Sequence, residues 1–249
     1  MRRTLSVLFC LTLIAAGDAS GAVSSLEAAT LDSAALTPLG AERSGNAAGT
    51  IPPWTGGITE PIPGYEPGNH HADPYPQDQI LFTITAANME QYAENLSAGQ
   101  KALLELHPDS WRMNVYRSRR SAAYPDFVYA ALKTNATVAT LIPAGRGGVR
   151  DSIVTSPFPL PRNGEEVIWN HNLRWRGVRI SRTDGTAAVT RAGKYTVTAS
   201  VQEIGIPYGS REESAFSRRY PNVMFALKSK IFAPALLSGD GTLAIETID

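Results

Sequence analysis

The sequence predicts an α+β fold in which helices come first and an antiparallel meander of strands follows. Two observations support this prediction. Between Thr85 and Gly177 most apolar residues recur at helical spacing behind capping residues, and after Gly177 they alternate with polar residues between glycine-containing turns. Because the two patterns are segregated along the chain, a parallel doubly wound sheet is disfavoured.

The first segment is predicted to be a secretory signal peptide over residues 1–21. Two arginines precede an apolar run over residues 5–16, and small residues follow the run. The run is shorter than the roughly 20 residues that a transmembrane helix needs, so we expect export without a transmembrane anchor. Cys10 is the single cysteine and lies inside the run, so the exported chain would have no disulfide and no thiolate metal site.

Residues 22–80 are predicted to form an extended segment, rich in proline and glycine, that packs on the folded body. Eight prolines and seven glycines lie between Pro38 and Pro76. Proline lacks the amide donor that a helix or a central strand needs, so long regular elements are disfavoured here. Trp54 and Tyr65 are the expected anchor points.

An α+β domain is predicted over residues 81–249, and it opens with helices. Thr85 is a candidate cap for a helix that ends near Asn95. Ser97, with a glutamine three residues later, fits a capping box for a second helix that Pro108 stops.

One strand and two further helices are expected next. The strand is indicated by the alternation of Trp111, Met113 and Val115 with polar or amphipathic neighbours. Pro125 suits the first turn of a third helix. A fourth helix is predicted to open at Asn163 and to end at Gly177, with one stripe formed by Val167, Ile168, His171 and Trp175.

The strands of the meander are predicted over residues 178–183, 186–191, 194–203, 223–233 and 242–248. The expected turns lie at Asp184-Gly185, at Ala192-Gly193 and at Gly239-Asp240-Gly241. In the fourth of these strands the apolar side chains at period two are Val223, Phe225, Leu227 and Ile231. These four residues, together with Trp169 and Trp175, are the candidates for lining a site for an apolar ligand; an ordinary core face is the alternative.

The composition narrows the class of function. The chain has 249 residues, 43% of them hydrophobic, and its 23 basic side chains balance 23 acidic ones. A protein that neutralises phosphates over a long surface needs a net basic charge, so no nucleic-acid partner is expected. The sequence contains no local signature of a nucleophile elbow, a zinc protease or a nucleotide-binding loop.

Two groups of histidines are candidates for chemistry. His70, His71 and Asp73 resemble a metal-binding cluster, although adjacent side chains of an extended segment point apart, and a solvated loop is the alternative. His171 is a candidate general base, or a core histidine that one hydrogen bond satisfies. No cofactor is expected.

Arg117, Arg119 and Arg120 form a basic knot before Tyr124-Pro125. We interpret it as a contact for an anionic head group or for a partner protein. Surface charge paired with Asp109 or Asp126 is the alternative interpretation.

Several longer motifs carry a resemblance to a known family. They are LTPLGAE at 36–42, GN at 45–46, IP at 51–52, WTGG at 54–57, FTITAANM at 82–89, GQKAL at 99–103, RSAAYP at 120–125, NAT at 135–137, PFP at 157–159 and IWNH at 168–171. With these motifs the sequence closely resembles the bacterial family of domain of unknown function 1329, whose members are described as outer-membrane lipoprotein-sorting-like proteins.

The resemblance implies a Gram-negative periplasmic protein with a lipoprotein-carrier-like half-barrel. In that fold a curved antiparallel sheet covers helices and leaves an apolar concavity. Members are commonly encoded near efflux-type inner-membrane transporters, and no catalytic residues are established for the family. Their chains are roughly twice as long, so we interpret this one as a half-length member with an incomplete half-barrel, and we expect residues 242–248 to form an unpaired edge that promotes self-association.

The leading hypothesis is a non-enzymatic carrier or adaptor for a hydrophobic ligand such as a lipid, a lipoprotein or an exported apolar compound. It would act in the periplasm, free or peripheral to the outer membrane, with an inner-membrane transporter or an outer-membrane protein as partner. A periplasmic hydrolase or metal-dependent enzyme that uses His171 or the His70/His71/Asp73 cluster is one alternative. A structural subunit of an envelope complex is the other.

Overall fold

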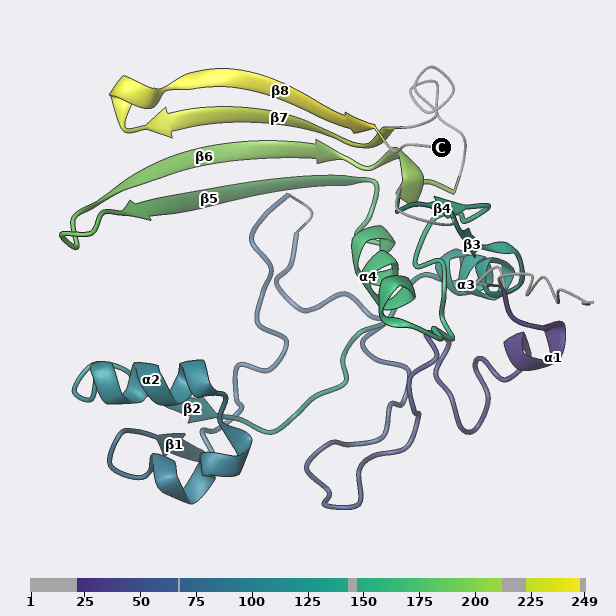
Figure 1. Cartoon of the computed structure of the whole chain (residues 1–249), viewed down its shortest axis with the longest axis horizontal. Coiled ribbons are helices and arrows are strands. Elements are labelled where there is room, and N and C mark those ends of the chain that lie inside the picture. The colour runs from purple at the N-terminus through teal and green to yellow at the C-terminus, as the bar shows by residue number, and fades with distance from the viewer. Residues whose placement is uncertain (1–21, 67, 143–146, 212–222, 247–249) are drawn as a thin grey trace, which may run out of the picture.

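The computed structural model describes residues 22–66, 68–142, 147–211 and 223–246 (Figure 1). Within these ranges the chain combines helices with antiparallel sheets, and none of the sheets closes into a barrel. The predicted α+β class with a curved antiparallel sheet is therefore confirmed. None of the helices described is both long and apolar enough to cross a membrane.

The bounds of the described helices are Ser25–Ala28 for α1, Ala98–Leu106 for α2, Asp126–Val138 for α3 and Gly164–Leu173 for α4. The helices α2 and α4 begin directly after their predicted capping residues, α3 begins directly after Pro125, and α1 was not predicted. At α2 the predicted capping box is present, because the Ser97 hydroxyl accepts from the Gln100 amide at 3.3 Å and the Ser97 amide donates to the Gln100 side chain at 2.8 Å. Asn163 caps α4, because its side-chain oxygen accepts from the amide of Glu166 at 3.0 Å.

Two predicted helix bounds are wrong, and side-chain hydrogen bonds explain both. Thr85 does not open a helix, because its amide donates to the Asn88 side chain and closes a turn, and a 3₁₀ helix, η1, then spans Met89–Asn95. The helix α4 ends at Leu173 rather than near Gly177. Its exit is set by Trp175, whose amide donates to the Thr155 hydroxyl at 3.3 Å.

The largest sheet has the strand order β5-β6-β7-β8, and all its neighbours are antiparallel. The strands span Arg179–Val189, Tyr195–Gly205, Val223–Ala233 and Gly239–Glu246. The predicted turn at Ala192-Gly193 is confirmed, with Gly193 at a φ of 76°. β8 is an edge strand that pairs only with β7 among the described residues. It contains residues 242–246 of the predicted edge strand, and residues 247 and 248 lie outside the described residues.

Two predicted turns of the sheet are wrong. Asp184-Gly185 lies inside β5, where Asp184 faces Ser200 of β6 and accepts a hydrogen bond from its hydroxyl at 2.9 Å. Residues 239–241 belong to β8, and the connection from β7 instead contains a short 3₁₀ turn, η3, at Ala235–Leu237.

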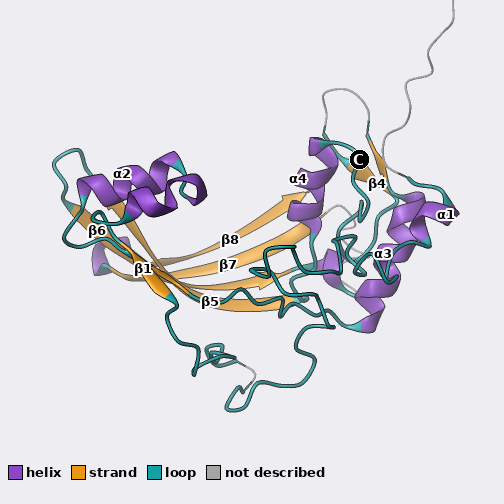
Figure 2. Ribbon diagram, turned by 90° about the horizontal axis from the view of Figure 1, so that it is seen from below, coloured by secondary structure: helices purple, strands orange, loops and turns teal. Residues whose placement is uncertain are grey.

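Two small sheets complete the architecture. β1 (Phe82–Ile84) pairs with β2 (Met113–Val115), the strand predicted from the alternation around Met113. β3 (Thr140–Leu141) pairs with β4 (Val149–Arg150). Figure 2 shows the large sheet as a curved arc, and Figure 1 shows α4 beside the end of the sheet at which β5 begins.

Many of the buried hydrophobic residues form three separate clusters among the described residues. The first joins Leu31 near α1 to Ala136 of α3, the second lies under α2 around Leu104, and the third lies around Val128 of α3. None of them includes a residue of β5–β8. The clusters thus lie around the helices and the small sheet β1–β2, and the large sheet extends beyond them.

A short segment around Thr155 ties the large sheet to the helices. Asn135 of α3 holds this segment, since its side-chain amide donates to the Ile153 carbonyl and its oxygen accepts from the Ile153 amide, both at 2.9 Å. The Thr155 carbonyl in turn accepts from the Tyr208 hydroxyl at 2.6 Å, in the 3₁₀ turn η2 (Pro207–Gly209) that follows β6. Burial raises the pKa of Tyr208, so this hydroxyl stays protonated as a donor.

The segment before β1 contacts the body at several points. The Val23 amide donates to the carbonyl of Ala136 at 2.8 Å, and the Ile58 amide donates to the carbonyl of Ser121 at 2.8 Å. Trp54, one of the predicted anchors, donates from its indole to the Ala122 carbonyl at 3.0 Å. Tyr65 instead stacks on His71, within the same segment.

Candidate functional site

The large sheet has one face that is less exposed than the other, and we call it the inner face. The register places Ile180 of β5 opposite Ile204 of β6, and Ile204 opposite Leu227 of β7. These three side chains are half-buried, as are Phe225 and Ile231 of β7. These five half-buried apolar residues identify the inner face, which also carries polar side chains.

The opposite face of the sheet is more open to solvent. Its side chains include Tyr195, Val197 and Val201 of β6 and Lys228 and Lys230 of β7, all of which are exposed. The period-two candidates Phe225, Leu227 and Ile231 therefore share the more covered face. Val223 is buried at the start of β7, next to an irregularity in its pairing with β8.

A row of polar side chains crosses the inner face on β5 and β6. Arg182 donates to the Gln202 side chain at 2.7 Å, and Gln202 donates to the Ser200 hydroxyl at 3.4 Å. Ser200 then donates to Asp184 at 2.9 Å. Ile180, Ile204 and Leu227 lie on one side of this row, so the apolar part of the inner face is bounded within the sheet.

Ile180, Ile204 and the polar row were not among the sequence-based candidates. The signal that could have found them is the turn at 192–193. Counting back from it along both strands places Ile180 opposite Ile204, as the structure does. The spurious turn at Asp184-Gly185 interrupts that count.

The two tryptophan candidates lie on or just after α4. Trp169 is half-buried on α4. Trp175 packs edge-on against Tyr124 and Phe127, with ring centroids 5.7 Å and 6.0 Å away, and its indole donates to the Gly209 carbonyl at 3.1 Å. Trp175 therefore holds the end of α4 against α3 and η2.

The predicted apolar stripe of α4 faces outward. Val167 and Ile168 are 51% and 60% exposed, and His171 is also exposed. The helix buries Leu173 and the carboxylate of Glu166, which accepts from the Arg162 amide at 2.6 Å. His171 is thus not a core histidine, and its imidazole has no hydrogen-bond partner in the part of the chain that is described.

The second group of histidines lies on an exposed stretch of the proline-rich segment. His71 stacks on the ring of Tyr65 at 5.3 Å, and Asp73 accepts from the Tyr75 amide at 2.8 Å. Across the described ranges, no three His, Cys, Asp or Glu side chains lie close enough together to hold a metal ion.

The three arginines of the basic knot have different environments. Arg119 pairs with Asp78 through two hydrogen bonds and lies over the ring of Tyr75, 4.1 Å from its centroid. The bond to Asp78 raises the pKa of Arg119. Arg120 donates to the carbonyls of Glu42, Arg43 and Ser44 at 2.7, 3.1 and 3.2 Å. Arg117 is exposed and has no hydrogen-bond or ion-pair partner among the described residues.

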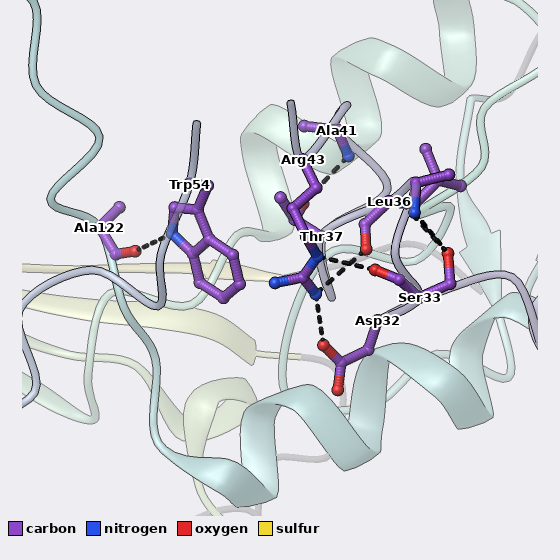
Figure 3. Close-up of polar contacts among 9 residues, drawn as sticks. Asp32, Ser33, Leu36, Thr37, Ala41, Arg43, Trp54 and Ala122 are labelled. Atoms are coloured by element: carbon purple, nitrogen blue, oxygen red, sulfur yellow. Dashed lines mark hydrogen bonds and ion pairs between the residues drawn. The ribbon is translucent and has the colours of Figure 1, made fainter. Parts of the chain in front are cut away.

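Arg43 organises the chain around the residues that Arg120 contacts (Figure 3). Its guanidinium donates to the Ser33 carbonyl and to the carboxylate of Asp32, both at 2.7 Å, and lies 4.9 Å from the ring centroid of Trp54. The Trp54 indole continues the chain of contacts to Ala122. The segment that carries Pro52 and Pro53 is thereby fixed against the stretch that carries the three arginines.

A cavity of about 280 Å³ lies between these two segments. All three arginines line it, together with Tyr75, Ser118 and Ser121, while prolines and Ile58 supply apolar walls. The Tyr75 and Ser121 hydroxyls are hydrogen-bonded to each other at 2.6 Å. No acidic side chain is among the residues that line the cavity.

Comparisons with known proteins identify relatives of this chain. The family described as "Protein of unknown function (DUF1329)" matches residues 83–249. A protein of Pseudomonas aeruginosa, "Uncharacterized protein PA3922", is 38% identical over 228 residues, which cover 92% of this chain and 49% of that protein. The chain therefore spans about half the length of this curated relative. No solved structure matches the chain.

Proposed function

The chain belongs to the DUF1329 family, and from this premise we propose that it is an exported, non-enzymatic carrier or adaptor that binds a hydrophobic ligand on the inner face of the large sheet. The ligand would be a lipid, a lipoprotein acyl chain or an exported apolar compound. The N-terminal sequence pattern supports a periplasmic location, and an efflux-type transporter or an outer-membrane protein is the proposed partner.

One observation carries the proposal: the apolar side chains of the inner face lie outside all three hydrophobic clusters. Ile180, Ile204 and Leu227 are half-buried and adjacent across three strands. An aliphatic side chain that passes from half-buried to fully covered gains about 1 kcal/mol, half of the value for complete burial. Four apolar side chains lie on the Leu227 side of the polar row, namely Ile180, Ile204, Phe225 and Leu227. Together they offer roughly 4 kcal/mol to an apolar ligand before the costs of binding.

The shape of the sheet supports the same conclusion. The strands β5–β8 form an arc (Figure 2) that does not close into a barrel. The polar row at Arg182 and Gln202 would confine an apolar chain to the part of the inner face around Leu227.

The test compares one substitution on each face of the sheet. Leu227→Gln on the inner face should weaken binding of a fluorescent fatty acid about tenfold, because the ligand then covers a polar group without a partner. Val201→Gln is the matched control, since Val201 lies on the opposite face of the neighbouring strand and is 37% exposed. The affinity of Val201→Gln for the fatty acid should equal that of the unsubstituted protein.

Native mass spectrometry of the protein purified from the periplasm provides the second measurement. A co-purified lipid that is lost in Leu227→Gln and retained in Val201→Gln would support the carrier role. Apo protein, together with no saturable fatty-acid binding, would rule the role out. Equal losses in both variants would place the ligand elsewhere, and circular dichroism would confirm that both variants are folded.

A further inference from the structure

The cavity beside the basic knot has a charge that the surrounding structure does not neutralise. Three arginines line it, and among the described residues the single carboxylate bound to any of them is that of Asp78, which pairs with Arg119. Arg120 is held by neutral carbonyl groups and Arg117 by none of the described residues. The walls of the cavity therefore carry an excess of positive charge that attracts an anion.

The roles of the three arginines leave one of them for a ligand. Arg119 is fixed by Asp78 and Tyr75, and Arg120 by the carbonyls of residues 42–44, so both are parts of the wall. Arg117 keeps its guanidinium donors unused in the described structure. A planar guanidinium with free donors is suited to bidentate contact with the oxygens of an anion.

Hydroxyl groups add donors of the kind that a phosphoryl group accepts. The Ser118 hydroxyl lines the cavity without a partner among the described residues. The hydrogen bond between Tyr75 and Ser121 uses one of their two protons, so this pair can donate the other. The volume of about 280 Å³ lies just below the usual range of small-molecule sites, about 300–1,000 Å³, which suits a small ligand or a head group.

We propose that this cavity is a binding site for an anionic phosphoryl group, with Arg117 as its principal contact and the hydroxyls of Ser118 and of the Tyr75–Ser121 pair as further donors. The site is separate from the inner face of the sheet and does not depend on the proposed carrier role. The phosphoryl group can belong to a soluble phosphate ester or to a lipid head group, because the contacts described involve the phosphate oxygens alone.

The first test measures binding of inorganic phosphate to the full chain by calorimetry. Removing a charge-assisted pair should cost about ten- to a hundredfold in affinity, so Arg117→Gln should bind that much more weakly than the unsubstituted protein. Arg117→Lys keeps the charge and loses the fork, and should lie between the two. Arg112→Gln is the matched control, because Arg112 is exposed, carries the same charge and does not line the cavity.

Competition then identifies the source of the phosphoryl group. Displacement of phosphate by glycerol 3-phosphate would indicate a soluble ester, and displacement by vesicles that contain phosphatidic acid, but not by phosphatidylcholine vesicles, would indicate a lipid head group. No saturable binding of phosphate, or equal binding by Arg117→Gln and the unsubstituted protein, would overturn the proposal. Arg117 is exposed and makes no hydrogen bond or ion pair with the described residues. Arg117→Gln and Arg117→Lys should therefore unfold at the same temperature as the unsubstituted chain.

Discussion

Replacing Asn135 by alanine tests how the large sheet is attached to the helices. Asn135 is fully buried, and its amide reaches the carbonyls of Ile153, Thr155 and Ser156 at 2.9, 3.4 and 3.2 Å. Its oxygen accepts from the Ile153 amide at 2.9 Å. The side chain thus satisfies four backbone groups on the segment that also binds Trp175 and Tyr208.

The cost of the substitution follows from which backbone groups lose their partner. The Thr155 carbonyl keeps the Tyr208 hydroxyl, and the Ile153 carbonyl keeps the Thr155 amide. The Ile153 amide and the Ser156 carbonyl lose the partner that Asn135 provides. A group without a partner costs about 1–3 kcal/mol when it is buried, as the Ser156 carbonyl is, and less when it is partly open to water, as at the exposed Ile153. Asn135→Ala should therefore lower the free energy of unfolding by roughly 3 kcal/mol.

Urea unfolding followed by circular dichroism measures this change. Thr134→Ala, on the exposed side of the same helix, is the control and should stay within about 0.5 kcal/mol of the unsubstituted protein. Asn135→Asp provides a second test. The second carboxylate oxygen of the aspartate replaces the amide nitrogen and is repelled by the carbonyl oxygens around it unless the carboxylate is protonated. Its loss should therefore be smaller at about pH 4 than at about pH 7. A loss below about 1 kcal/mol for Asn135→Ala would refute the reasoning, since it would mean that water or rearrangement satisfies both groups.

Two further predictions concern the segment before β1. Hydrogen bonds from the Ser24 amide and hydroxyl, and then Arg162, lower the pKa of Glu27 below 4.5. The stability that Glu27 gives to α1 is therefore complete above the pKa of the unfolded state and is lost as the pH falls through the lowered pKa. An NMR titration should show that α1 frays in acid and that Ser24→Ala raises the pKa of Glu27. An unshifted pKa of Glu27 would contradict the capping geometry. Gly40 has a φ of 82°, and a Cβ there would lie 1.9 Å from the Pro159 carbonyl oxygen, while Gly49 has a φ of 68° and open space around it. In thermal unfolding, Gly49→Ala should lower the free energy of unfolding by roughly 1 kcal/mol, the cost of an alanine in the left-handed region. Gly40→Ala should lower it by at least about 2 kcal/mol more, because of the clash with Pro159. Equal losses would mean that the Pro159 segment can move away.

Local signals predicted those parts of the fold that local interactions determine. The capping box at Ser97 and the turn at Ala192-Gly193 are both in place, because each needs only residues a few positions apart. The end of α4 was not predictable in this way, because the Trp175 amide donates to the hydroxyl of Thr155, twenty residues earlier in the chain. Asp184-Gly185 has the composition of a turn, but its backbone stays in β5 and Asp184 bonds to Ser200 across the sheet.

The candidate sites show the same division. The period-two pattern of β7 correctly grouped Phe225, Leu227 and Ile231 on one face. The sequence also marked Arg117, Arg119 and Arg120 as a basic group, but it could not assign their roles. Those roles depend on Asp78, which is 41 positions from Arg119, and on carbonyls 76–78 positions from Arg120. The predicted partners Asp109 and Asp126 form no ion pair with these arginines in the described chain.

The separation of the hydrophobic clusters has a consequence for how the protein opens. Each cluster joins elements that are near one another, and β5–β8 are held together by strand pairing rather than by any of the three. Each region then has its own free energy of local opening. The amides of the large sheet can therefore exchange with solvent while β1 and β2 remain paired. Occupation of the inner face would slow exchange in β5–β7 and leave the cluster around Leu104 unchanged, which makes exchange protection a map of where a ligand lies.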